Sequence, residues 1–179
     1  MTKDTKDWYS SWFDTSFYHI LYKHRDDKEA QAFMDNLTSY LNIPENSSIL
    51  DVACGKGRHA VYLNSIGYEV TGIDLSEKSI AFAKQFENDN LHFQVHDMRK
   101  AYPKQFNAVF NLFTSFGFFK NAEDDLNTIK AIKTNLNDHG VGVIDFLNAD
   151  FVVNNLVEAN TKTIDGIAFN LKRYIENGF

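Results

Sequence analysis

The sequence predicts an α/β protein built around a mostly parallel β-sheet. Short apolar runs typical of buried strands alternate with segments of helical spacing between residues 48 and 147. Acidic residues or glycines stand at the ends of several of these runs. Strands that are separated by helices pair in parallel through right-handed crossovers, and the helices cover both faces of the sheet. We therefore expect a three-layer protein.

The first two strand and helix units follow each other directly. Residues 48–54 form an apolar run that predicts a buried strand, and residues 59–66 have the spacing of a helix. Residues 68–75 predict the second strand. Ser76 then occupies an N-cap position ahead of a helical run over residues 80–86. The repetition indicates two consecutive βα units.

Three further strands continue the pattern. Residues 91–97 alternate apolar and polar side chains, and residues 106–113 are almost entirely apolar, which predicts a strand near the centre of the sheet. A helix is expected over residues 124–135 and is ended by Gly140, and a fifth strand is expected over residues 141–147.

Both ends of the chain add to this core within a single predicted domain, residues 1–179. Residues 1–45 contain an aromatic-rich segment and a helical pattern, which predict an N-terminal helical cap. The α/β core occupies residues 46–148. Residues 149–179 contain a short helical pattern and a hairpin signal at Asp165-Gly166.

Composition and charge restrict the classes of partner. The formal net charge is -6, from 18 basic and 24 acidic residues, and no cluster of Lys or Arg offsets it, so a nucleic acid is not expected. The single cysteine, Cys54, cannot form an internal disulfide. No signal or membrane-spanning segment is predicted, which favours a cytoplasmic location. The histidines lack the spacing of metal ligands, so no metal is expected.

The loops after the first three strands carry residues suited to an adenosine ligand. Gly55 and Gly57 let the backbone approach a ligand closely, next to the N-terminus of a helix. Asp74 can accept hydrogen bonds from ribose hydroxyls. Asp97 can accept from an adenine amino group while Met98 covers a ring face.

A nicotinamide-binding protein is the main alternative for this loop. Residues 55–60 match the dinucleotide pattern Gly-x-Gly-x-x-Ala. Asp51, however, lies inside the strand four residues before the first glycine. A carboxylate there would repel a pyrophosphate and pair well with an ammonium group. The sequence therefore favours a ligand that carries a positive charge at this end.

With these motifs the sequence resembles the class I S-adenosylmethionine-dependent methyltransferases, which have a Rossmann-like sheet. Trp12-Phe13-Asp14, Leu21-Tyr22-Lys23-His24-Arg25 and the run from Asp51 to His59 are similar to a bacterial small-molecule methyltransferase group. The resemblance covers roughly residues 8 to 150. Two departures are Ala53, where many members have the first glycine, and a C-terminal part that is short for the family.

The resemblance implies a set of contacts with S-adenosylmethionine and with a methyl acceptor. The implied cofactor residues are Tyr18, Arg25, Asp51, Ala53, Gly55, Gly57, Asp74, Leu75, Asp97, Met98 and Asn111. The implied acceptor-side residues are Tyr22, Phe113, Ser115 and Phe116. No catalytic base is predicted from the sequence.

The expected activity is direct transfer of a methyl group to a nitrogen or oxygen of a small molecule. A non-catalytic S-adenosylmethionine-binding module is the second hypothesis, because the resemblance implies closing antiparallel strands that this chain lacks. Residues 149–179 are then either the start of an acceptor lid or a short closing hairpin. Phe116, Phe118 and Phe119 either line an acceptor pocket or contact a partner subunit, so a homodimer stays open.

Overall fold

The structure is a computed structural model that describes residues 15–22 and 27–175. A five-stranded sheet forms its centre. The strands are β1 (Ser48–Val52), β2 (Glu69–Asp74), β3 (Leu91–Val95), β4 (Phe106–Asn111) and β5 (Leu136–Ile144). Their order is β3-β2-β1-β4-β5, and every neighbouring pair is parallel. The predicted parallel α/β sheet is confirmed.

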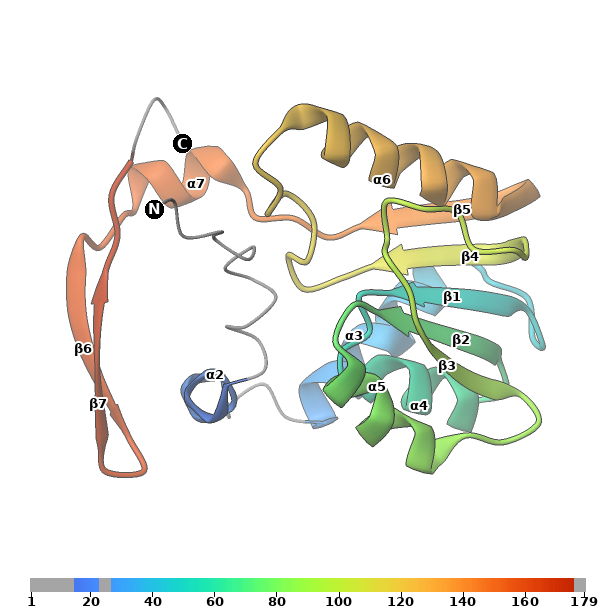
Figure 1. The fold of residues 1–179 in the computed structure, drawn as a ribbon, viewed down its shortest axis with the longest axis horizontal. Coiled ribbons are helices and arrows are strands. Elements are labelled where there is room, and N and C mark those ends of the chain that lie inside the picture. The colour runs from blue at the N-terminus through green and yellow to red at the C-terminus, as the bar shows by residue number, and fades with distance from the viewer. Residues whose placement is uncertain (1–14, 23–26, 176–179) are drawn as a thin grey trace, which may run out of the picture.

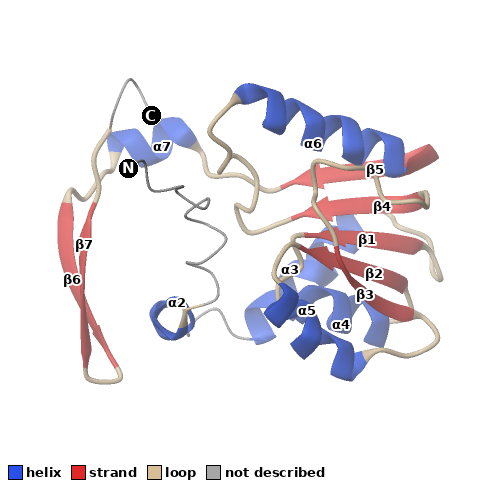
Figure 2. Ribbon diagram, in the orientation of Figure 1, coloured by secondary structure: helices blue, strands red, loops and turns tan. Residues whose placement is uncertain are grey.

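Helices cover both faces of this sheet (Figure 1, Figure 2). One face carries α3 (Asp27–Tyr40), α4 (Arg58–Ser65) and α5 (Glu77–Ala83), which continues into the short 3₁₀ turn η1 (Lys84–Phe86). The other face carries α6 (Ala122–Asn135). Ser76 caps α5 as predicted, since its Oγ accepts a hydrogen bond from the backbone N–H of Ser79 at 3.1 Å.

The hydrophobic core has two layers because both faces of the sheet are buried. Val109 and Phe110 are consecutive on β4, and both side chains are fully buried. Val109 packs in a cluster with Ile132 of α6, whereas Phe110 packs in a cluster with Met34 of α3 and Leu63 of α4. Side chains alternate across a strand, which explains the nearly continuous apolar character of β4.

The boundary between α6 and β5 differs from the prediction. The helix ends at Asn135 and the strand begins at Leu136, so Gly140 does not end the helix. The Asn135 side chain donates to the carbonyl oxygens of Tyr102 and Lys104 at 2.6 and 2.7 Å. These bonds fix the helix end against the loop before β4, and the chain then pairs with β4 at once.

The remaining elements lie outside the sheet. They are α2 (Ser16–Leu21), α7 (Ala149–Asn154), β6 (Ala159–Ile164) and β7 (Ile167–Lys172). Asp165 and Gly166 have φ angles of 50° and 79°, which confirms the predicted hairpin turn. β6 and β7 form a two-stranded sheet of their own and do not close the five-stranded sheet. Among residues 15–22 and 27–175, no helix combines the length and apolar character that crossing a bilayer requires.

Candidate functional site

The carboxyl ends of the strands mark the edge at which open α/β sheets bind ligands. The chain runs outward from β1 through β2 to β3, and then returns to the other side of β1 to form β4 and β5. The point between β1 and β4 is therefore the topological switch point of the sheet. The hairpin β6–β7 and α2 stand opposite these strand ends (Figure 1).

The loop after β1 turns sharply through left-handed backbone conformations. Ala53, Gly55 and Gly57 have φ angles of 60°, 56° and 82°. A Cβ built on Gly55 would meet no atom within 4 Å, whereas one on Gly57 would lie 2.7 Å from the Phe93 ring. Gly55 is thus the residue that leaves space at the site, and Gly57 is needed for packing as well as for its φ angle.

Asp51 is a buried carboxylate beneath this loop. The backbone N–H of Ala60, in the first turn of α4, is near this carboxylate and favours its ionised form. Its Oδ2 has no hydrogen-bond partner among the described residues. Burial, and then the nearby Asp74, raise the pKa of Asp51 to about 7, although the Ala60 N–H and the Arg58 guanidinium lower it.

Asp74, the last residue of β2, holds the glycine loop in place. Its Oδ2 accepts a hydrogen bond from the backbone N–H of Gly55, and its Oδ1 accepts one from the backbone N–H of Ser76, both at 2.8 Å. Leu75 beside it is half-exposed. A carboxylate oxygen can accept two hydrogen bonds, so these contacts are compatible with the predicted bonds to ribose hydroxyls.

Asp97, after β3, is paired within the protein. Arg99 Nη2 donates to its Oδ2 at 2.6 Å, and Arg99 Nη1 donates to Asp124 of α6 at 3.0 Å. Burial alone would raise the pKa of Asp97, but the hydrogen bonds from Arg99 bring it below its usual value. Met98 packs against the core cluster of Leu50. The predicted contacts of Asp97 and Met98 with adenine stay predictions.

Asn111 ends β4 fully buried. Its Nδ2 donates to the carbonyl oxygen of Val52 at 3.0 Å, while its Oδ1 has no partner among the described residues. Phe110 is opposite Asp51 in the sheet, so Asn111 and Asp51 project from opposite faces. Two buried polar side chains, each with an oxygen that lacks a partner in the described chain, therefore flank the switch point.

The loop after β4 places an aromatic ring against the start of α4. Phe113 stacks on His59, with ring centroids 4.7 Å apart, and meets Phe33 of α3 edge-on at 5.6 Å. The Arg58 guanidinium lies 5.1 Å from the Phe113 centroid. Burial, and then Arg58, lower the pKa of His59 to about 4. His59 is therefore neutral at physiological pH.

The other predicted acceptor-side and N-terminal residues form fewer contacts with the residues at the switch point. Ser115 Oγ donates to the backbone carbonyl oxygen of the residue three before it at 2.9 Å, and Phe116 is half-buried. The Tyr18 and Tyr22 rings lie 5.0 Å apart at α2, which faces the strand ends (Figure 1). Arg25 lies outside the described residues.

Sequence reasoning missed three residues that shape this edge. Phe93 packs against the glycine loop, Arg99 joins β3 to α6, and Asp145 bonds to the loop after β4. Asp145 could have been found by the rule that identified Asp74, since both stand at the carboxyl end of a strand. Phe93 and Arg99 carry no comparable signal.

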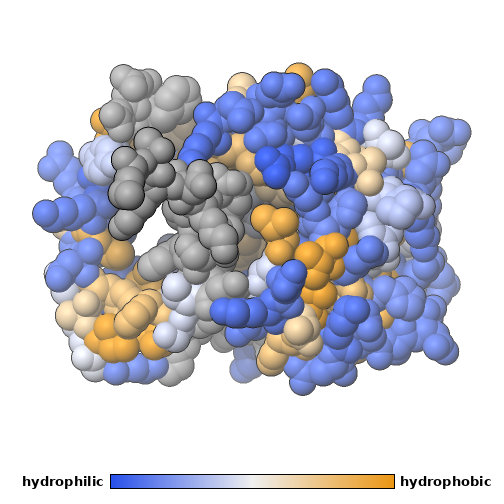
Figure 3. Space-filling view, in the orientation of Figure 1, coloured by the Kyte–Doolittle hydropathy of each residue, from blue (hydrophilic) through white to orange (hydrophobic). Residues whose placement is uncertain are grey.

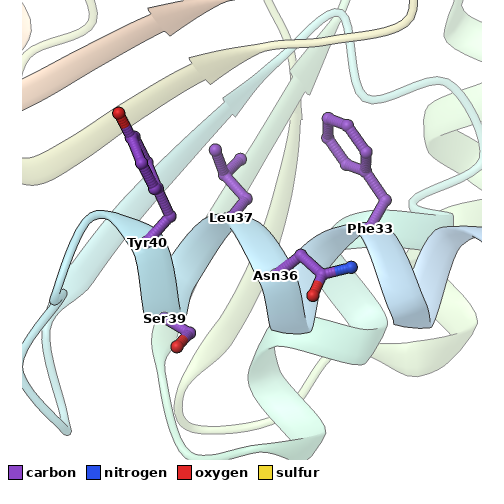
Figure 4. Close-up of a pocket in the computed structure, with 5 residues that line it drawn as sticks. All are labelled: Phe33, Asn36, Leu37, Ser39 and Tyr40. Atoms are coloured by element: carbon purple, nitrogen blue, oxygen red, sulfur yellow. The ribbon is translucent and has the colours of Figure 1, made fainter.

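A separate hollow runs along α3. It is an open depression of about 580 Å³, lined by Phe33, Asn36, Leu37, Ser39 and Tyr40. Figure 4 shows Phe33, Leu37 and Tyr40 projecting from the same side of the helix. Phe33 connects it with the loop after β4, through its contact with Phe113. The hollow carries no titratable group apart from the Tyr40 hydroxyl.

The residues at the switch point fit S-adenosylmethionine. The open space at Gly55 suits a ligand that follows the backbone of the loop closely. The Asp51 oxygen without a partner suits the ammonium group of an amino acid, because a buried carboxylate is stabilised by a cation. Asp51 and the glycine loop would then hold the amino acid part, and Asp74 the ribose.

Comparison with known proteins gives the family directly. A family model described as a methyltransferase domain matches residues 43–173. The chain belongs to this methyltransferase family. The predicted class, fold and S-adenosylmethionine cofactor are thereby confirmed at the level of the family, which favours this cofactor over a nicotinamide dinucleotide.

Individual relatives share part of the chain. YqeM of Bacillus subtilis, named as a methyltransferase, is 34% identical over 126 residues, which are 67% of this chain and 51% of YqeM. A dTDP-3-amino-3,4,6-trideoxy-alpha-D-glucopyranose N,N-dimethyltransferase of Streptomyces venezuelae is 33% identical over 104 residues, 57% of this chain and 43% of that protein. The chain thus spans about half the length of these curated relatives.

Solved structures support the same fold. DesVI of Streptomyces venezuelae is 25% identical with a TM-score of 0.63, and the match covers 84% of this chain and 65% of DesVI. A methyltransferase of Clostridium acetobutylicum has a TM-score of 0.67 at 20% identity, over 83% of this chain and 62% of that one. The second likeness shows the fold alone.

Proposed function

We propose that the protein transfers a methyl group from S-adenosylmethionine to a nitrogen of a small-molecule acceptor. The observation that carries the proposal is the buried Asp51 carboxylate, whose Oδ2 lacks a partner in the described chain beneath the glycine loop. When bound, the cofactor supplies a methyl group on a positively charged sulfur and an ammonium group that complements this carboxylate.

Nitrogen is the better acceptor because an amine needs no dedicated base, and the buried Asp51 carboxylate at the switch point is assigned to the ammonium group of the cofactor. The imidazole of His59, in the first turn of α4 after the glycine loop, has a pKa lowered to about 4 and is stacked on Phe113. So weak a base cannot activate a hydroxyl group. An amine can lose its proton to water beforehand, and its lone pair then forms the N–C bond as the S–C bond breaks.

Amino sugars are the first acceptors to test. The dimethyltransferase of Streptomyces venezuelae, 33% identical over its matched part, is named for an amino sugar nucleotide. The net charge of -6 does not favour a polyanionic macromolecule as the alternative acceptor. The acceptor proposal therefore rests on this relative and on the charge of the chain.

Calorimetry with S-adenosylhomocysteine and with NAD tests the cofactor. We expect binding of the first and none of the second, and Asp74→Ala should weaken binding by about tenfold or more. Asp89→Ala is the matched control, because Asp89 is an exposed carboxylate that precedes β3 and so lies at the opposite edge of the sheet from the carboxyl ends of the strands. Binding of NAD alone would contradict the proposal.

Transfer of a labelled methyl group to amines, amino sugars and phenols tests the reaction. Turnover with amines or amino sugars, and none with phenols, is the expected result. Tight cofactor binding with no turnover on any acceptor would favour the non-catalytic binding module instead.

A further inference from the structure

The turn after β4 has a backbone conformation that needs outside support. Phe113 and Thr114 are consecutive, and their φ angles are 57° and 59°. Residues other than glycine seldom adopt this left-handed region, and a β-branched residue such as Thr114 does so least readily. Two such residues in sequence persist only where surrounding contacts determine their conformation.

Asp145 supplies these contacts from the end of β5. Its backbone N–H donates to the carbonyl oxygen of Asn111 at 2.9 Å, and its carbonyl oxygen accepts from the backbone N–H of Thr114 at 3.3 Å. Its Oδ2 accepts from the backbone N–H of Phe113 at 2.9 Å. Asn111 pairs with Ile144 in the sheet, so Asp145 extends the β4–β5 ladder beyond the last pair of strand residues.

The supported turn determines where the Phe113 ring lies. In this conformation the ring stacks on His59 and lies near Arg58, the first two residues of α4 after the glycine loop. Asp74 ends β2 and Asp97 follows β3 on one side of β1, whereas Phe113 follows β4 on the other side. Phe113 is therefore beside the part of the site that lies beyond the ribose.

We propose that Asp145 is a positioning residue: it holds the Phe113–Thr114 turn so that the Phe113 ring borders the amino acid part of the cofactor. This inference rests on the proposed function, because it takes S-adenosylmethionine as the ligand. It assigns to Asp145 a role that acts through Phe113 and not through direct contact with the ligand.

Two ligands that differ only at this end test the proposal. S-adenosylhomocysteine has the amino acid part, and methylthioadenosine shares the adenosine and the sulfur but lacks it. By calorimetry, Asp145→Ala should raise the Kd of S-adenosylhomocysteine about tenfold and leave that of methylthioadenosine within about twofold. Asp145→Asn keeps a side-chain oxygen that can accept from Phe113, so it should bind both ligands nearly as the wild type does.

Two further variants complete the set. Phe113→Ala removes the ring and leaves Asp145 in place, and it should reproduce the selective loss of S-adenosylhomocysteine binding. Asp138→Ala removes an exposed carboxylate from the same strand and should bind both ligands as the wild type does. In hydrogen exchange, the Phe113 and Thr114 amides should lose protection in Asp145→Ala and keep it in Asp145→Asn.

The outcomes separate this inference from the proposed function. Wild-type protein that binds S-adenosylhomocysteine, together with an Asp145→Ala or Phe113→Ala variant that binds it equally well, overturns the inference alone. An Asp145→Asn variant as weak as Asp145→Ala also overturns it. Wild-type protein that does not bind S-adenosylhomocysteine overturns the proposed function and this inference with it.

Discussion

At the scale of single residues, the loop after β1 contains a conformation that alanine seldom adopts. Ala53 has a φ of 60°. An L-residue in this region costs about 1–2 kcal/mol, whereas glycine there loses about 0.5–1 kcal/mol through the entropy of the unfolded chain. Replacing Ala53 by glycine removes the strain, which stabilises the protein, and adds the entropy loss, which destabilises it. The strain is the larger of the two effects.

Ala53→Gly should therefore raise the free energy of unfolding slightly, by up to about 1 kcal/mol. Ala53→Val should lower it by more than about 1 kcal/mol, because a β-branched residue fits this φ angle less well. Urea denaturation measures both. Ala101→Gly, in an exposed loop without a positive φ, is the control and should not be stabilising. Equal stability of the Gly and Val variants would contradict the strain at Ala53.

Asp51 and His59 should make stability depend on pH in opposite directions. The pKa of Asp51 is raised to about 7, so its contribution to stability is complete at low pH and is lost as the pH rises to about 7. The pKa of His59 is lowered to about 4. Its contribution to stability is therefore complete above pH 6.5, the ordinary pKa of a histidine in the unfolded chain, and is lost as the pH falls to about 4. The two contributions oppose each other between about pH 4 and pH 6.5.

Asp51→Asn separates the two contributions. Relative to the wild type, the ligand-free variant should gain up to about 1.4 kcal/mol of stability for each pH unit between about pH 4 and pH 7, because the buried charge is removed. Urea denaturation at several pH values measures this difference. A stability difference that is independent of pH would show that Asp51 does not titrate in this range.

Ligand binding should depend on the same carboxylate. The affinity for S-adenosylhomocysteine is expected to rise as Asp51 ionises near pH 7 and to fall at a higher pH, where the ammonium group of the ligand loses its proton. Calorimetry across this range tests it. Asp51→Asn should bind weakly and lack the rising part of the profile; an unchanged profile in this variant would exclude the pairing with the ammonium group.

At the scale of elements, one aromatic side chain joins β3 to β2 and to the loop after β1. A Cβ on Gly72 would lie 2.6 Å from the Phe93 ring and 2.9 Å from the Cys54 sulfur. Gly57 faces the same ring. The glycines in β2 and in the loop therefore leave room for Phe93, and the position of β3 supports the shape of the ligand-binding loop.

Gly72→Ala should lower the free energy of unfolding by about 1–3 kcal/mol, because it overpacks this contact. Phe93→Leu in the same chain should restore part of the loss by making space. Gly142→Ala on β5 is the matched control, since its nearest contacts are 3.3 Å away and it should cost less. Thermal or urea unfolding measures all three. No recovery in the double variant would contradict the role of Phe93.

At the scale of the whole molecule, the hairpin β6–β7 is not part of the five-stranded sheet and lies opposite the carboxyl ends of its strands (Figure 1). Half-buried Ile167, Phe169 and Leu171 alternate with exposed residues along β7. Apolar surface gathers over the hairpin in Figure 3, at the lower left. A two-stranded hairpin is marginally stable by itself, whereas β1 and β4 have a partner strand on both sides.

Hydrogen exchange should therefore be faster for the amides of residues 159–172 than for those of β1 and β4. The measurement is made on the full chain, with and without S-adenosylhomocysteine. The amides of β1 and β4 serve as the internal control. Equal protection in the ligand-free protein would show that the hairpin is stabilised by contacts comparable to those of the sheet.

The sequence by itself determined the order of the strands and helices, the glycine loop and the family. These features depend on short stretches of chain: the periodicity of apolar residues, the cap at Ser76 and the turn at Asp165-Gly166 are all local. The family motif likewise lies within a single strand, loop and helix. Local patterns of this kind can be recognised without knowing which elements pack against each other.

Only the tertiary structure decided which partners the residues at the strand ends contact. Asp97 is held by Arg99, which also reaches Asp124, and the end of α6 is set by Asn135 and not by Gly140. Asp145 acts on a turn that lies about thirty residues earlier in the chain. Such pairings depend on strand register and on packing between distant segments, which local residue patterns do not specify.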